Sequence, residues 1–184
     1  MTAPELRTAF RSVLDGLDDD SRRSVVDSLL TRAVKSTAAW KPGRPPAKIV
    51  DEAKSFAAAA SQVHVADPRD ASDHLRRGSR AFLAGDHASA RGVFEALLLP
   101  IAVGDIDLGQ HELVDEVLNV DVHSCVSQFV TSVYITTPLA DRADAVFNAI
   151  KHVESIASLA NPIQDMENVS AGALPELGLF LPVG

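Results

Sequence analysis

The side chains best suited to chemistry lie between His111 and Asp115. These two residues are four apart, so a helix would place both on one face, as two ligands of one metal ion require. Glu112 and Glu116 add carboxylates that could accept or donate protons. His123 follows, and it could supply a third ligand if the chain folded back. A metal-dependent or acid–base enzyme that uses residues His111–Asp121 is therefore one hypothesis.

This segment lacks an essential part of the metal-binding pattern. A zinc-binding helix of the His-Glu-x-x-His type needs a second histidine, and Asp115 occupies that position. The rest of the sequence contains no nucleophile motif around a serine or cysteine and no glycine-rich phosphate loop. Cys125 precedes Val126 in an apolar helical pattern, which indicates a small buried side chain. We therefore expect no cofactor and no tightly bound zinc or iron.

The same segment belongs to an acidic connector, residues 105–121. No lysine or arginine occurs from Gly92 to Ala140, so nothing nearby in the sequence balances its charge. Arg76, Arg77 and Arg80 of an earlier helix could pair with the connector; otherwise it is an exposed anionic surface, which is the interpretation we prefer. We predict that it faces a basic protein or peptide partner. The predicted partner-binding residues are Asp105, Asp107, Glu112, Asp115 and Glu116.

Composition excludes several classes of protein. Of the 184 residues, 46% are apolar and 23% are charged, as in an ordinary globular protein that can bury a core. A single cysteine excludes an internal disulfide. No apolar run approaches the roughly 18 residues that a membrane span needs. The chain begins with a polar helical pattern and no signal segment, so we expect a cytoplasmic protein without a membrane partner.

Charge is distributed unevenly along the chain. Residues 1–50 carry nine Lys/Arg and six Asp/Glu, a net charge of +3, and the rest carry eight and nineteen, a net charge of −11. The overall charge of −8 argues against nucleic-acid binding. One exception is the basic, proline-rich linker, residues 41–48. Its Pro42-Gly43-Arg44-Pro45 segment resembles the core of an AT-hook, although a proline replaces one of the two arginines. Because an AT-hook binds the minor groove of DNA, a nucleic-acid-associated factor that acts through residues 40–48 is a second alternative.

Residues 67–100 have the pattern of two antiparallel helices joined by a short turn. Asp67 suits the N-cap of the first helix, and Gly85 suits the left-handed position after its end. Asp86 caps the second helix, which we expect to end at Pro100. A connection this short makes the two helices pack against each other. The residues expected inward are Ala71, Leu75, Gly78 and Phe82 on the first helix and Ala90, Val93, Phe94, Leu97 and Leu98 on the second.

This hairpin resembles a tetratricopeptide repeat, a unit of about 34 residues. The family's aromatic residue in the first helix is absent, because Ala81 occupies its place. The resemblance, which covers less than a fifth of the chain, implies stacked antiparallel hairpins with a concave groove for a partner peptide or helix. The residues that carry it are Gly78, Ala81, Gly85, Ala90, Phe94, Leu97 and Pro100.

Residues 121–159 contain a degenerate echo of this unit. Its aromatic and apolar residues stand 53 positions after their counterparts, at Tyr134, Ala143, Phe147 and Ile150. The last helix of this second pair should begin at Thr137-Pro138. Its residues expected inward are Leu139, Ala143, Val146, Phe147, Ile150, Val153 and Ala157. The first helix of the pair follows the capping residue Asp121, although the β-branched residues in 129–137 leave a strand as the alternative.

The remaining segments fit the same all-α architecture. Residues 1–40 predict an N-terminal helical hairpin with Leu6, Phe10, Val13 and Leu29 inward, and residues 49–160 predict a repeat-like helical body. Residues 161–184 form an apolar tail that we expect to dock on the body. We therefore predict a single compact domain of stacked antiparallel hairpins. Such a protein would act as a non-enzymatic interaction or scaffold module.

Overall fold

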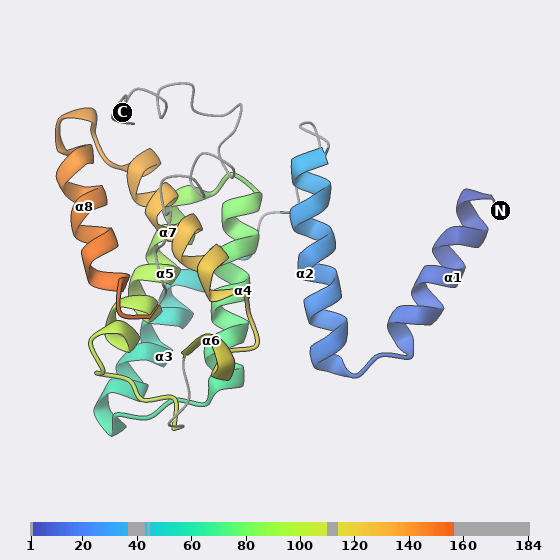
Figure 1. Cartoon of the computed structure of the whole chain (residues 1–184), viewed down its shortest axis with the longest axis horizontal. Coiled ribbons are helices and arrows are strands. Elements are labelled where there is room, and N and C mark those ends of the chain that lie inside the picture. The colour runs from blue at the N-terminus through green and yellow to red at the C-terminus, as the bar shows by residue number, and fades with distance from the viewer. Residues whose placement is uncertain (1, 37–42, 44, 110–113, 157–184) are drawn as a thin grey trace. The chain divides into compact units, whose positions relative to one another are not determined.

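The computed structural model describes residues 2–36, 43, 45–109 and 114–156. Regular elements in these ranges are helices, apart from one isolated β-bridge (Figure 1). The all-α class is therefore confirmed. The prediction of a single compact domain is wrong, because the chain divides into two compact units, Met1–Trp40 and Lys41–Gly184. The division falls at the proline-rich linker, where prolines interrupt the helical pattern.

The first unit contains α1 (Ala3–Asp15) and α2 (Asp19–Ser36). Arg22 of α2 joins the two helices, because its guanidinium donates to the carbonyls of Leu14 and Leu17 at 2.8 and 3.0 Å. The Leu14 carbonyl lies in the last turn of α1, where a helix leaves its last acceptors without intrahelical partners, and Leu17 lies in the connection to α2. Arg22 therefore supplies hydrogen-bond donors to carbonyl groups at the connection between the two helices.

No side chain of α1 is buried. Leu6, Phe10 and Val13 are 56%, 43% and 62% exposed, and Leu29 of α2 is 40% exposed. The prediction that these residues pack inward is wrong, because α1 and α2, the two described helices of this unit, leave them exposed.

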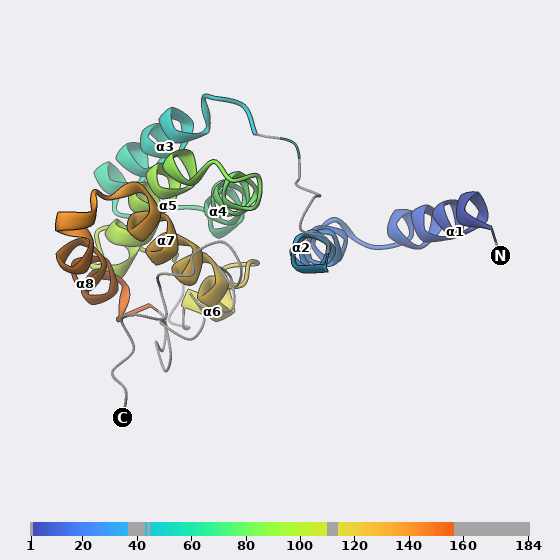
Figure 2. The same cartoon turned by 90° about the horizontal axis from the view of Figure 1, so that it is seen from above.

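In the second unit, the other long helices pack around α5 (His87–Ala102). The helices in contact with α5 are α3 (Ile49–Val63), α4 (Pro68–Leu83), α7 (Val122–Thr136) and α8 (Arg142–Val153), as Figure 2 shows from above. The short helix α6 (Val114–Val117) and the 3-10 helix η1 (Leu139–Asp141) flank α7 in the sequence. None of the described helices is long and apolar enough to cross a bilayer.

The α4–α5 hairpin forms as its capping residues predicted. Asp67 accepts a hydrogen bond from the Arg69 N–H (2.8 Å), and Asp86 accepts one from the Ser89 N–H (3.3 Å). Gly85 takes a φ of 82°, the left-handed conformation that ends α4. All of the residues predicted to lie inward on these two helices are buried.

Helix α5 continues past Pro100 to Ala102, beyond its predicted end. Proline has no N–H, but in the last turn its presence removes a single helical hydrogen bond. The Pro100 carbonyl accepts a hydrogen bond from the Asp105 N–H (2.8 Å), which directs the chain into the connector.

Helix α7 is enclosed on all sides for most of its length. Residues 125–134 are all buried, and the segment is a helix rather than the alternative strand. Two buried hydroxyl groups find acceptors inside the same helix: Thr131 donates to the Ser127 carbonyl (2.8 Å) and Ser132 to the Gln128 carbonyl (2.7 Å). These two hydroxyl groups can therefore be buried because they are satisfied locally.

Helix α8 buries only part of the face predicted to lie inward. Val153 is buried, as predicted, and Val146 and Ile150 are partly buried against the core. Phe147 is 67% exposed, Leu139 is 72% exposed and Ala143 is also exposed. The prediction that these three residues pack inward is wrong. The 3-10 turn at 139–141 precedes α8, so a helical spacing counted from Pro138 does not continue into α8.

Candidate functional site

The acidic connector begins at a backbone contact with the segment after α3. Val65 and Asp107 form a parallel β-bridge. The Asp107 N–H donates to the His64 carbonyl (3.0 Å), and the Asp107 carbonyl accepts from the Ala66 N–H (2.8 Å). The Asp107 side chain also accepts from the Gly109 N–H (2.8 Å). This end of the connector is therefore held by backbone hydrogen bonds.

Two side chains of α4 hold the other end of the connector at Asn119. The Ser72 hydroxyl accepts from the Asn119 N–H (3.1 Å), and Arg76 donates to the Asn119 carbonyl, 43 residues away in the sequence. Arg76 also pairs with Asp73 (3.1 Å), and its side chain is only 6% exposed. A buried guanidinium is stable only when such partners satisfy it. The connector is thus fixed to the body at both ends.

Four carboxylates of the connector lie on the surface, and we call them the connector surface: Asp105, Asp107, Glu116 and Asp121. Within the described part of the chain none of them forms an ion pair. Arg77, one of the expected partners, pairs instead with Glu52 of α3 (2.6 Å). The connector surface therefore presents negative charge that no lysine or arginine neutralises by contact.

Several predicted site residues lie outside the described ranges. His111 and Glu112 are among them, and for Asp115 only the backbone, in α6, is described. His123 is exposed in the first turn of α7. The alternative metal site at His111, Asp115 and His123 therefore remains a prediction. Among the residues that the structure does describe, no group of three or more His, Cys, Asp or Glu could hold a metal ion.

Lys41, Pro42 and Arg44 of the predicted basic linker, residues 41–48, and the whole of the predicted tail, residues 161–184, also fall outside the described ranges. The AT-hook-like interpretation of the linker and the docking of the tail therefore stay predictions.

Two other reactive side chains belong to the helical body. The His74 ring packs against Phe56, with 4.9 Å between centroids, and its Nδ1 has no hydrogen-bond partner. Burial lowers the pKa of His74, and the charge of Arg77 acts in the same direction, so the ring is neutral at pH 7. Cys125 is buried, as predicted, with its Sγ 3.7 Å from the Ser79 hydroxyl. A buried thiol of this kind is a poor nucleophile.

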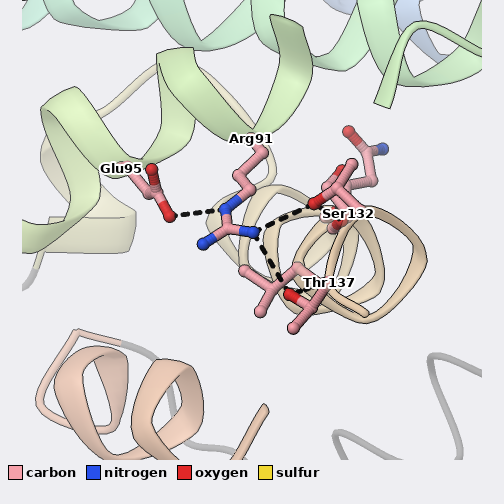
Figure 3. A network of polar contacts seen from close by, with 7 residues as sticks. Arg91, Glu95, Ser132 and Thr137 are labelled. Carbon is pink, nitrogen blue, oxygen red and sulfur yellow. Dashed lines mark hydrogen bonds and ion pairs between the residues drawn. The ribbon is translucent and has the colours of Figure 1, made fainter. Parts of the chain in front are cut away.

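The sequence analysis missed a polar cluster at the C-terminal end of α7 (Figure 3). Arg91 of α5 donates from Nη1 to the hydroxyls of Thr136 and Thr137 (3.0 and 3.2 Å) and from Nε to Glu95 (2.7 Å). Arg142 donates to the Thr137 carbonyl (2.9 Å). Two guanidinium groups therefore meet the negative end of a helix dipole. We call Arg91, Arg142, Thr136 and Thr137 the α7 clamp.

A signal for the α7 clamp was present in the sequence. Arg91 and Arg142 are the cations on either side of the stretch without lysine or arginine, from Gly92 to Ala140. The stretch between them contains no lysine or arginine of its own, so a cation that contacts it must come from outside it, as Arg76 does at Asn119. Arg142 also stacks over the Tyr134 ring, with its guanidinium carbon 4.8 Å from the centroid. The arrangement joins α5, α7 and α8, which indicates a structural role.

We expect Arg91→Met to lower the free energy of unfolding by about 1–2 kcal/mol, because the variant loses hydrogen bonds from a charged donor to two threonine hydroxyls. Urea denaturation would measure the change. Glu95→Gln keeps the threonine bonds and should cost at most about 0.5–1 kcal/mol, as expected for a half-exposed ion pair. Lys54→Met on the exposed side of α3 is the matched control. Equal effects of Arg91→Met and Lys54→Met would show that the α7 clamp contributes nothing.

No protein-family model matches the chain, and comparisons with curated proteins and with solved structures found no match. The function must therefore be argued from the residues themselves.

Proposed function

We propose that the chain is a non-enzymatic helical interaction module that binds a basic segment of a protein or peptide through the connector surface. The observation that carries the proposal is the combination of fixed backbone and unpaired charge. Asp107 is tied to the body by backbone hydrogen bonds, and Asn119 is tied to it by the side chains of Ser72 and Arg76. Asp105, Glu116 and the other two carboxylates are exposed without ion pairs.

A fixed anionic surface favours binding for two physical reasons. Its exposed carboxylates form no ion pair within the described residues, so a partner that brings lysine or arginine can pair with them without breaking existing ion pairs. Because the backbone is held at both ends, little conformational entropy is lost when the partner binds. Long-range attraction would also steer a basic partner and raise the association rate, and salt would reduce this effect.

The repeat-like architecture supports this role. The start of α5 meets the end of α7 through Arg91 and Thr137, and Ser155, just after α8, donates to the Ala102 carbonyl at the end of α5 (2.8 Å). Helices α5 and α8 therefore run in one direction and α7 in the other, as two successive antiparallel pairs would. The exposure of Ala143 and Phe147 departs from a regular repeat. We propose a helical-repeat protein in which the connector lies between the two pairs.

Binding of a labelled lysine-rich peptide tests the proposal. Fluorescence anisotropy at low salt should show saturable binding that weakens steeply between about 50 and 300 mM NaCl. The double variant Asp105→Asn/Glu116→Gln should weaken binding roughly 5–10-fold, and it should keep or slightly raise stability because like charges are removed. Asp107 and Asp121 are left intact, since their side chains accept backbone hydrogen bonds from Gly109 and Ser124.

The matched control is Asp51→Asn/Glu154→Gln, which removes the same charge from exposed positions outside the connector. The control should weaken peptide binding less than the connector variant. If both variants weaken binding equally, only the net charge matters and the connector surface is not a binding site. Loss of stability in Asp105→Asn/Glu116→Gln with unchanged peptide binding would also contradict the proposal.

A further inference from the structure

Helix α8 has an apolar side chain that nothing in the described chain covers. Phe147 is 67% exposed at the middle of α8, and the smaller Ala143 is exposed one turn before it. The opposite side of the helix already packs on the body through Ala149 and Val153. Phe147 therefore belongs to a second, outward face of α8. A large aromatic side chain in this position loses hydrophobic stabilisation as long as it faces water.

Two opposite charges flank Phe147 on this outward face. Asp144 lies three residues before Phe147 and Lys151 lies four residues after it, and both are exposed. Within the described residues, neither forms a hydrogen bond or an ion pair. They are seven positions apart, or about 10 Å along the helix axis, so they cannot pair with each other. The outward face thus holds an acid and a base that both lack a partner.

The positions of these charges match a twofold arrangement. At about 100° per residue, Asp144 and Lys151 lie roughly 60° and 40° around the helix from Phe147, on the same side. If two α8 helices pack antiparallel with Phe147 at the centre, Asp144 of each copy faces Lys151 of the other. The twofold axis creates this ion pair twice. Ala143, one turn before Phe147, is small, so the two helices can approach closely beside the phenylalanine rings.

We propose that two copies of this chain associate through the outward face of α8, antiparallel, with Phe147 against Phe147 and two Asp144–Lys151 ion pairs between the copies. The second copy fits this face because the charge pattern is complementary to itself under a twofold rotation. A contact along 12 helical residues spans about 18 Å, which places it at the small end of specific interfaces. The dimer should therefore be weak and reversible. The contact uses no carboxylate of the connector surface, so it is tested separately from peptide binding.

Sedimentation velocity of the whole chain over a range of concentrations tests the proposal. The molecular mass should rise from the monomer value of 19.5 kDa towards twice that value as the concentration increases. Phe147→Ser should remain monomeric over the same range, with unchanged helicity by circular dichroism because the side chain is exposed. Val103→Ser, at a valine that is 69% exposed at the end of α5, is the matched control and should dimerise normally.

A charge exchange tests the orientation of the two helices. Asp144→Lys and Lys151→Asp should each weaken dimerisation by at least about tenfold, because each single change places like charges opposite one another at both ion pairs. The double variant Asp144→Lys/Lys151→Asp should regain dimerisation. Each single change also places a charge unfavourably with respect to the helix dipole, and the double variant carries both of these charges. Recovered dimerisation in the double variant therefore cannot result from a more stable helix.

Three outcomes would overturn the proposal. The first is a chain that stays monomeric up to millimolar concentration. The second is a dimer that persists in Phe147→Ser. The third is a dimer that Leu6→Ser/Phe10→Ser abolishes while Phe147→Ser leaves it intact, since this would place the contact on the exposed residues of α1.

Discussion

Phe94→Ala should lower the free energy of unfolding by about 3–5 kcal/mol, whereas Phe147→Ala should change it by less than about 0.5 kcal/mol. Phe94 is fully buried in α5, so its removal loses apolar burial and leaves a cavity among closely packed helices. Phe147 is two-thirds exposed, so its removal leaves no cavity. The two residues occupy equivalent places in the repeat-like pattern, which makes the expected difference a direct test of the structure.

Chemical denaturation monitored by circular dichroism, at a protein concentration too low for association, would measure both changes. The ratio of the two effects matters more than either value. Similar losses for Phe94→Ala and Phe147→Ala would mean that α8 turns Phe147 into the body, as the sequence pattern alone suggested. The α8 face proposed for self-association would then not exist.

Gly78→Leu should destabilise the body by about 1–3 kcal/mol. A Cβ at this position would lie 3.1 Å from both Val93 Cγ1 and Phe94 Cε1, so α4 and α5 would have to separate to admit a larger side chain. Leucine gains about 1 kcal/mol of helix propensity over glycine, and the overpacking must exceed this gain. The destabilisation is therefore expected despite a better helix former.

Gly78→Ala is the internal control for this prediction. Its Cβ needs a shift of only a few tenths of an ångström in its neighbours, and the gain in helix propensity offsets that cost, so its thermal midpoint should stay close to that of the wild type. A thermal midpoint in Gly78→Leu equal to that of the wild type would show that α4 and α5 are not in close contact at Gly78.

Local chemistry explains why the α4–α5 hairpin could be predicted from the sequence. Asp67, Gly85 and Asp86 act on neighbouring backbone groups, so their spacing alone determines where the two helices begin and end. The connection is short enough to force contact between the helices. Burial of their apolar faces then follows without knowledge of the rest of the fold.

Helical spacing alone could not predict the outward face of α8. Ala143 and Phe147 have a spacing that indicates one helix face, but spacing does not say whether a neighbouring element covers that face. The same limit applies to α1, whose apolar residues Leu6 and Phe10 are regularly spaced and exposed. Coverage depends on packing between elements distant in the sequence.

In the candidate site, too, some features can be predicted from the local sequence and others depend on contacts between distant elements. The negative charge of Asp105 and Glu116 can be read directly from the sequence. The anchoring of the connector cannot, because Arg76 reaches Asn119 across 43 residues and Asp107 pairs with the segment after α3. Arg91 was missed for the same reason, since its threonine partners lie in a different helix.

The enclosure of α7 has a consequence for how the body is made during translation. Residues 125–134 supply part of the interior against which α4 and α5 pack, yet these residues leave the ribosome after both of those helices. Until α7 emerges, the nascent chain carries apolar helix faces without their final cover, a state that is prone to aggregation. Once α7 is in place, its central amides can exchange with solvent hydrogen only when the body opens as a whole, so α7 should hold the slowest-exchanging amides of the chain.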